Sequence, residues 1–186
     1  MYVAKDFSAL LGIQGMSDTL LNNHFALYGG YVTNTNKLID QMKLAQAGTP
    51  EYAELHRRFG WEWNGMRLHE LYFGNIGKHA VPISNRVLKQ KIESVWGSLL
   101  NWEKEFRDIM AMRGIGWAVL VYDKKDNTLF NVWVNEHDTG LLAGATPLLV
   151  MDVFEHAFML DYGVKRIDYI TMFMSSIDWH TVEERV

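Results

Sequence analysis

The sequence predicts an α+β fold, in which an N-terminal helical hairpin precedes a second half with helices and a three-stranded antiparallel sheet. Two observations predict it: amphipathic stretches fill the chain before residue 74, and β-rich runs appear only after residue 114. A third is the stretch GNIGKHAVPISN at residues 74–85, whose Gly, Pro, Ser and Asn content marks a boundary. We therefore expect two domains, residues 1–80 and residues 81–186.

The helical hairpin is predicted from two long stretches of the first half. They are TLLNNHFALYGGYVTNTNKLIDQMKLAQ (19–46) and EYAELHRRFGWEWNGMRLHELYF (51–73). Both repeat apolar residues every three to four positions, which is the spacing of one face of an amphipathic helix. Two such stretches in succession indicate a helical hairpin.

The second half mixes helix and strand. Residues 86–113 form a further helical stretch, interrupted or joined around the Gly97–Ser98 pair. The runs WAVLVYD (117–123) and TLFNVWVNE (128–136) are β-rich, and KKDN between them is typical of the turn of an antiparallel hairpin. TPLLVMDV (146–153) is a third, more continuously apolar strand, after which the chain returns to helix.

Composition and charge exclude several classes of protein. The chain has no cysteine, so any metal must be held by His, Asp or Glu, and disulfides are excluded. A net charge of −4 without a basic stripe argues against nucleic acid or an anionic membrane as a partner, and short runs such as HRR (56–58) are expected to be solvated. No apolar run could span a bilayer and the first residues lack a secretory signal, so we expect a cytoplasmic protein.

Four residues together suggest a metal site. His24 and His69 lie on the apolar faces of the two hairpin stretches, and the apolar run 148–151 ends in Asp152, followed by His156. Taken singly, each histidine is more often a core residue bonded to a carbonyl or water. Together the four offer three imidazoles and a carboxylate, a donor set that suits iron, manganese or zinc. Three other histidines lie in polar or terminal contexts and are expected at the surface: His56, His79 and His180.

The segment that carries Asp152 and His156 resembles the signature of a known family. DVFEHAF (152–158) is similar to the DxWEHAx signature of the iron/manganese superoxide dismutases, with Phe154 where Trp is usual. Other segments match that family in the same order along the chain: HFALYGGYVTNTNKL, NGMRLHELYF, WGSLLNWEKEF and GIGWAVLV. The resemblance covers nearly the whole chain.

The resemblance implies an antioxidant oxidoreductase that converts two superoxide anions to oxygen and hydrogen peroxide. Its metal ligands would be His24, His69, Asp152 and His156, which hold one iron or manganese ion per subunit with a solvent molecule as the fifth ligand. The metal would alternate between its trivalent and divalent states. The family also implies a homodimer, with association into a tetramer left open, in which Glu155 reaches across the interface to hydrogen-bond the ligand His of the other chain.

The resemblance also assigns residues around the metal. Tyr31 matches the family's gateway tyrosine, which relays protons, and Arg166 matches an arginine near the mouth of the substrate funnel, where it would steer the anion. The walls of the site would come from Trp117, Tyr72 and Phe154, for which packing is as good an explanation as a chemical role. Two departures concern the interface: Tyr31 follows His24 by one residue fewer than usual, and Met159 replaces a bridging Tyr.

His137 bears on the identity of the metal. In this family a Gln, from the second ligand helix or from the loop after the β-hairpin, hydrogen-bonds the metal-bound solvent. Here the helix position is Gly65, as in manganese members, and the loop position is His137, as in iron or metal-tolerant members. We assign the solvent contact to His137, favour iron and leave manganese open as a second functional ion.

Two other functions remain open at the level of sequence. One is a different mononuclear non-haem iron enzyme that uses two His and one carboxylate, although a third His ligand leaves too little open coordination for an organic substrate. The other is a non-catalytic metal-binding descendant of the same scaffold.

Overall fold

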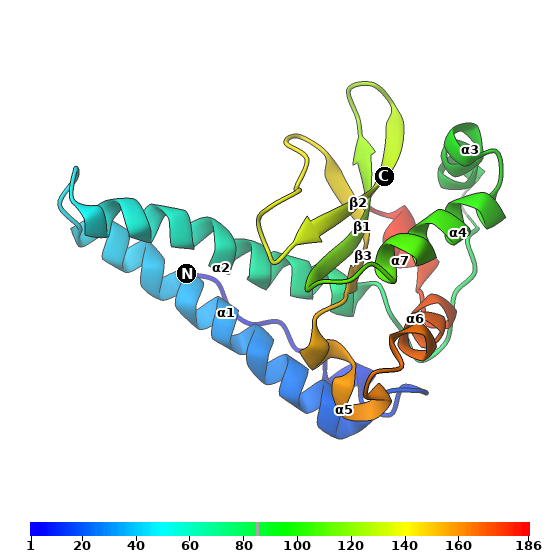
Figure 1. Cartoon of the computed structure of the whole chain (residues 1–186), viewed down its shortest axis with the longest axis horizontal. Helices are drawn as coiled ribbons and strands as arrows, with labels where there is room; N and C mark the ends of the chain where they lie inside the picture. Colours follow the sequence, from blue (N-terminus) through cyan, green and yellow to red (C-terminus); the bar gives the residue numbers. More distant parts are fainter. Residues whose placement is uncertain (85) are drawn as a thin grey trace.

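A computed structural model describes residues 1–84 and 86–186 (Figure 1). The α-helices are α1 (Asp18–Leu44), α2 (Pro50–Gly74), α3 (Arg86–Trp96), α4 (Leu99–Met110), α5 (Met159–Tyr162), α6 (Arg166–Ser175) and α7 (Trp179–Glu183). The strands are β1 (Gly116–Asp123), β2 (Thr128–Asn135) and β3 (Thr146–Asp152), and two short 3₁₀ helices are η1 (Ser8–Leu10) and η2 (Glu155–Ala157). This is the predicted α+β fold.

Helices α1 and α2 form the predicted hairpin, joined at one tip of the molecule and packed side by side (Figure 1). Each begins at a capping residue: the Ser17 hydroxyl accepts from the backbone N–H of Leu20, and the Thr49 hydroxyl accepts from that of Tyr52. Pro50 occupies the first turn of α2, where the N–H that it lacks would have no helical partner. The capping residues therefore fix the first residue of each helix, and this in turn determines which side chains lie on its apolar face.

The three strands form one antiparallel sheet in the order β2-β1-β3. The central strand β1 is buried from Gly116 to Tyr122, because α4 packs on the sheet and β2 and β3 flank it. Its register pairs Trp117 with Asp152, so the last residue of β3 lies beside the start of β1. The Gly97–Ser98 pair interrupts the helical stretch as expected: Gly97 has a φ of 78°, and Ser98 caps α4.

The sheet and the hairpin meet along α2. Strand β3 packs against α2, and η2, which follows β3, packs against α1 (Figure 1). The end of β3 is thereby brought to the open end of the hairpin, beside the first turns of α1 and the last turns of α2. Among the helices of the described residues, none has both the length and the apolar character needed to cross a membrane. The division into domains at residues 80 and 81 stays a prediction.

Candidate metal centre

The four residues singled out in the sequence converge at this junction. His24 comes from α1, His69 from α2, Asp152 from the end of β3 and His156 from η2. One potential ligand atom of each lies within 4.8 Å of all the others. His24, His69 and Asp152 are fully buried, and His156 is partly buried. Four separate elements thus supply one compact group of three imidazoles and one carboxylate.

The contacts of the cluster centre on one oxygen, Oδ2 of Asp152. It lies 3.1 Å from Nε2 of His24, 3.2 Å from Nε2 of His156 and 3.6 Å from Nε2 of His69. Two atoms that are each about 2.1 Å from the same ion lie about 3.0–3.6 Å apart when they subtend 90–120° at it. The spacing of these atoms therefore fits ligands of a single ion.

The orientation of His69 leaves a ligand atom without any other partner. Its Nδ1 donates to the carbonyl oxygen of Gly65, one helical turn earlier, at 2.6 Å. A neutral imidazole with its proton on Nδ1 has a bare lone pair on Nε2. That Nε2 is buried and has no hydrogen-bond partner among the described residues, so a bound cation would satisfy it. The donor set and this nitrogen together fit iron or manganese.

Burial and the carboxylate set the charges of the cluster. Burial lowers the pKa of His24, and it lowers the pKa of His69 to about 3, so both imidazoles are neutral. Burial also opposes ionisation of Asp152, but the charge and hydrogen bond of His156 and the hydrogen bond of His24 outweigh it and hold the pKa below its ordinary value. The site therefore keeps one anion and two neutral imidazoles, the forms that bind metals. At His156, burial is outweighed by the charge and hydrogen bond of Asp152, which raise the pKa, so that a metal ion would displace a proton there.

The three predicted wall residues lie against the cluster. The ring of Trp117 is 4.9 Å from that of His69, the ring of Tyr72 is 5.3 Å from that of His24, and the ring of Phe154 stacks 5.2 Å from that of His156. The carboxylate of Asp152 is also held by one backbone group: the N–H of Phe154 donates to its Oδ1 at 2.8 Å. Aromatic rings thus enclose the cluster and restrict water around the carboxylate.

Tyr31 and His137 form a bonded pair beside the cluster. Oη of Tyr31 lies 2.7 Å from Nε2 of His137, and Nε1 of Trp117 donates to Nδ1 of His137 at 3.0 Å. His137 is fully buried although it lies in the loop after β2. Gly65 leaves the space for Tyr31, since a Cβ at that position would lie 2.6 Å from Cδ1 of the Tyr31 ring. The contact expected between His137 and a metal-bound solvent molecule stays a prediction.

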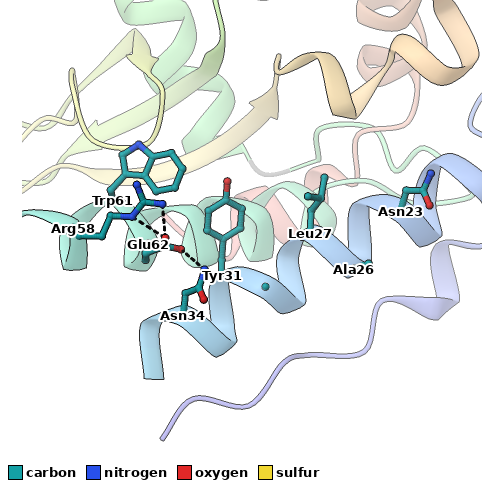
Figure 2. A pocket seen from close by; sticks show the side chains of 9 residues that line it. Asn23, Ala26, Leu27, Tyr31, Asn34, Arg58, Trp61 and Glu62 are labelled. Atoms are coloured by element: carbon teal, nitrogen blue, oxygen red, sulfur yellow. Dashed lines mark hydrogen bonds and ion pairs between the residues drawn. The ribbon is translucent and has the colours of Figure 1, made fainter. Parts of the chain in front are cut away.

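An open groove of about 660 Å³ runs beside Tyr31. Figure 2 shows Arg58, Trp61 and Glu62 of α2 on one side of Tyr31, and Leu27 and Asn23 of α1 on the other. Arg58 donates to Glu62 at 2.6 and 2.8 Å, and its guanidinium lies 4.0 Å from the centroid of the Trp61 ring. The run HRR is exposed, as expected, but the ion pair and ring contact of Arg58 were not predicted from the sequence. The nearby Trp and Glu, one helical turn on, were the available signal.

Glu155 and Arg166 lie outside the closed cluster. Glu155 is exposed and lines a hollow together with His156 and five apolar or amide neighbours. Arg166 begins α6 and donates to the carbonyl oxygens of Met112 and Gly114, at 2.9 and 3.3 Å. Their expected roles at an interface and in substrate steering stay predictions.

Comparisons with known proteins agree with this geometry. A sequence model of the iron/manganese superoxide dismutases, C-terminal domain, matches residues 84–185. The iron superoxide dismutase of Cupriavidus metallidurans is 33% identical over 179 residues, which cover 93% of this chain and 89% of the relative. That of Aquifex pyrophilus is 35% identical over 190 residues, with coverages of 97% and 89%.

A manganese enzyme is also among the similar proteins. Manganese superoxide dismutase 1 of Halobacterium salinarum is 38% identical over 122 residues, which cover 66% of this chain and 60% of the relative. The family match over more than half of the chain and the near full-length relatives agree with the fold and with the four-residue cluster. The chain belongs to the iron/manganese superoxide dismutase family.

Proposed function

We propose that this chain is a superoxide dismutase whose single iron or manganese ion is held by His24, His69, Asp152 and His156. The observation that carries the proposal is the convergence of three imidazole nitrogens on Oδ2 of Asp152, one of them buried and without another partner. Because three imidazoles and a carboxylate are engaged, little open coordination is left for an organic substrate.

The reaction balances with two superoxide anions and two protons. One superoxide gives up an electron and leaves as oxygen, and the other takes up an electron and two protons and leaves as hydrogen peroxide. The ion, when bound, changes between two oxidation states and so supplies the electron exchange. The protein's own side chains must then deliver protons to a site that aromatic rings largely enclose.

The Tyr31–His137 pair is suited to proton delivery. The indole of Trp117 can only donate, so Nδ1 of His137 must accept. Burial lowers the pKa of His137 to about 4, so the ring is neutral and carries its single proton on Nε2. That proton is donated to Oη of Tyr31, which leaves the phenolic proton of Tyr31 free for a further acceptor in the site. A neutral imidazole has one N–H where the Gln of the family has two, so His137 cannot donate fully to Tyr31 and to solvent together.

We favour iron as the working metal, with manganese as a second functional ion. His137 in place of Gln supports iron, and both iron and manganese enzymes are among the similar proteins. Gly65 supports manganese through the family pattern, yet the packing of Tyr31 on it gives an independent reason for its small size. The single cluster among the described residues supports one ion per chain.

We place the interface of a dimer at the exposed face that carries Glu155. Three apolar side chains beside it are exposed in the single chain: Leu27, Met159 and Leu160.

Glu155→Ala should weaken dimerisation and activity together, because the same carboxylate would orient a ligand imidazole across the interface. Sedimentation and an activity assay on one sample test this, with the exposed Glu54→Ala as control. A fully active monomer of Glu155→Ala would refute the coupling. Pairing into tetramers and a cytoplasmic location stay predictions.

Arg166 is our candidate for steering superoxide to the site. Its Nε and Nη2 are buried without a hydrogen-bond partner among the described residues, so part of its charge is uncompensated. Arg58, a cation near Tyr31, is neutralised by its ion pair with Glu62. A positive charge that is not paired raises the local concentration of an anionic substrate.

A superoxide-consumption assay on metal-loaded protein tests the proposed function. Protein loaded with iron or with manganese should consume superoxide much faster than the same amount of free ion, and Asp152→Ala should not. If metal is bound stoichiometrically and superoxide decays no faster than with the free ion, the chain is a non-catalytic metal-binding descendant or another type of iron protein.

A further inference from the structure

Trp61 closes the side of His137 that faces the groove. The indole ring lies 4.4 Å from the imidazole ring of His137 and 5.7 Å from the ring of Tyr31, centroid to centroid. The ring of Phe154 also stacks on His137, at 4.9 Å. The guanidinium of Arg58 in turn lies over the ring of Trp61 (Figure 2). His137 thus contacts two aromatic side chains from distant parts of the sequence.

A hydrogen bond to Glu136 links Trp61 to the loop that carries His137. The carboxylate of Glu136 accepts this bond from Nε1 of Trp61 at 3.2 Å. Glu136 has a φ of 50°, in the left-handed region that residues other than Gly, Asn and Asp seldom adopt. Its backbone N–H donates to the carbonyl oxygen of Ile115. Hydrogen bonds of both the backbone and the side chain therefore hold Glu136 in this strained conformation. Because Glu136 is bonded to the next residue along the chain, its conformation sets the direction in which His137 leaves the loop.

We propose that Trp61 and Glu136 are positioning residues that fix His137, so that its Nε2–H stays directed at Oη of Tyr31. The inference rests on the proposed role of the Tyr31–His137 pair in superoxide turnover. Neither residue touches the four-residue cluster among the contacts described, and each acts through His137. The loop is otherwise fixed by backbone bonds between Asn135 and Thr139, which do not constrain the imidazole itself.

Water from the groove can compete for the hydrogen bond between Tyr31 and His137. A hydrogen bond between neutral groups contributes only about 1 kcal/mol net when water can replace either partner. The groove beside Tyr31 is open, and Trp61 is one of its lining residues. With the indole in place, the Tyr31–His137 bond lies behind an aromatic ring in a medium of low dielectric constant, where it is stronger and better directed. Loss of the indole or of its anchor would let water compete for Nε2–H.

The chain offers a matched control in Trp63. It lies two residues from Trp61 on the same helix, is partly buried to a similar degree and also donates from Nε1, in this case to Oη of Tyr2 at 3.3 Å. Trp61→Phe and Trp63→Phe therefore each keep an aromatic ring and remove one indole hydrogen bond. Only the first removes the link to Glu136.

The experiment compares Trp61→Phe, Trp63→Phe, Glu136→Ala and Glu136→Gln with wild type by two readouts. The first is the ¹⁵N–¹H spectrum of His137 in zinc-loaded protein, since zinc is diamagnetic and takes the same ligands. The second is superoxide turnover of iron-loaded protein. In Trp61→Phe and Glu136→Ala, we expect faster exchange of the His137 Nε2–H with water. Turnover in both should fall by about tenfold, which corresponds to about 1.4 kcal/mol.

The conservative variant separates positioning from general damage. Glu136→Gln keeps an oxygen acceptor for the Trp61 indole and should restore both readouts, and Trp63→Phe should leave both unchanged. If Trp61→Phe fails to fold, Glu136→Ala, on the exposed side of the loop, carries the test alone. Unchanged Nε2–H exchange and unchanged turnover in Glu136→Ala would overturn the inference, as would an equal effect of Trp63→Phe.

The two readouts also separate this inference from the proposed function. If wild type does not consume superoxide at all, the proposed function fails, yet the exchange of His137 Nε2–H still reports whether Trp61 and Glu136 position the ring. If wild type is active and the exchange is the same in every variant, the proposed function stands and the positioning role is wrong.

Discussion

The four-residue cluster and the Tyr31–His137 pair lie side by side but are built in opposite ways. The cluster is closed and charged: one carboxylate is surrounded by three imidazoles and an aromatic wall. The pair is neutral, held by a chain of hydrogen bonds from Trp117 through His137 to Tyr31, and it borders an open groove. From this difference we expect metal retention and the proposed proton delivery to be separable, so that substitutions in one region should spare the function of the other.

The largest effects should come from the cluster. His24→Ala, His69→Ala, Asp152→Ala and His156→Ala should each abolish metal binding and superoxide turnover, because each removes a direct ligand and leaves the others around a partly empty cavity. Metal analysis of the purified variants measures this, with the exposed His56→Ala as control. Full metal occupancy in any of the four would remove that residue from the ligand set.

His137→Ala should separate turnover from metal binding. The variant should retain its metal and lose most turnover, because Tyr31 loses the partner that directs its phenolic proton. His137→Gln, which restores the family's usual amide, should change the ratio of iron-supported to manganese-supported turnover. Metal content and turnover are measured on the same samples after loading with each ion. Unchanged turnover in His137→Ala would place the residue outside the active site.

Gly65→Ala should have a smaller effect, on turnover and stability but not on metal binding. The added Cβ would lie 2.6 Å from Cδ1 of Tyr31, so the ring must move, at a cost in stability of about 1–3 kcal/mol. Turnover should fall while metal stays bound. Gly60→Ala on the same helix is the matched control, since nothing lies within 4 Å of its Cβ and it should gain about 0.5–1 kcal/mol from helix propensity. Equal denaturation midpoints for the two variants would contradict the close packing.

The smallest effect is a change in the pH dependence of stability. Burial lowers the pKa of His137 from 6.5 to about 4 in the folded protein. Between these values the unfolded chain binds more protons, so the free energy of unfolding falls as the pH falls through this window. In metal-free protein, His137→Gln should make this slope shallower by at most about 1.4 kcal/mol per pH unit. Denaturant unfolding of both proteins across the window measures it, and identical slopes would mean that His137 does not titrate as a buried group.

Much of the cluster could be predicted from the sequence because its signals are local. The apolar stripes fixed the inward direction of His24 and His69, and the apolar run before Asp152 indicated a buried strand end. The helical hairpin and the β-hairpin turn at residues 124–127 were likewise predicted from residue spacing and turn composition. That the four side chains meet at one point depended on the resemblance to a known family.

The surroundings of Tyr31 could not be predicted because they depend on contacts between segments far apart in the chain. The bond between Trp61 and Glu136 joins residues 75 positions apart, and the left-handed conformation of Glu136 has no signal in its residue type. The space that Gly65 leaves for Tyr31 depends on how closely α1 approaches α2. Spacing along one helix predicts a face, but not which side chain of a neighbouring helix will cover it.

The central claim is that one ion, held by the four-residue cluster, carries superoxide turnover. The most direct measurement is a titration of metal-free protein with iron, and separately with manganese, in which bound ion and turnover are determined on the same fractions. We predict that turnover rises in proportion to bound metal and stops rising at one ion per chain, and that Asp152→Ala shows neither binding nor turnover. Turnover that does not follow bound metal, or that stays in Asp152→Ala, would contradict the account.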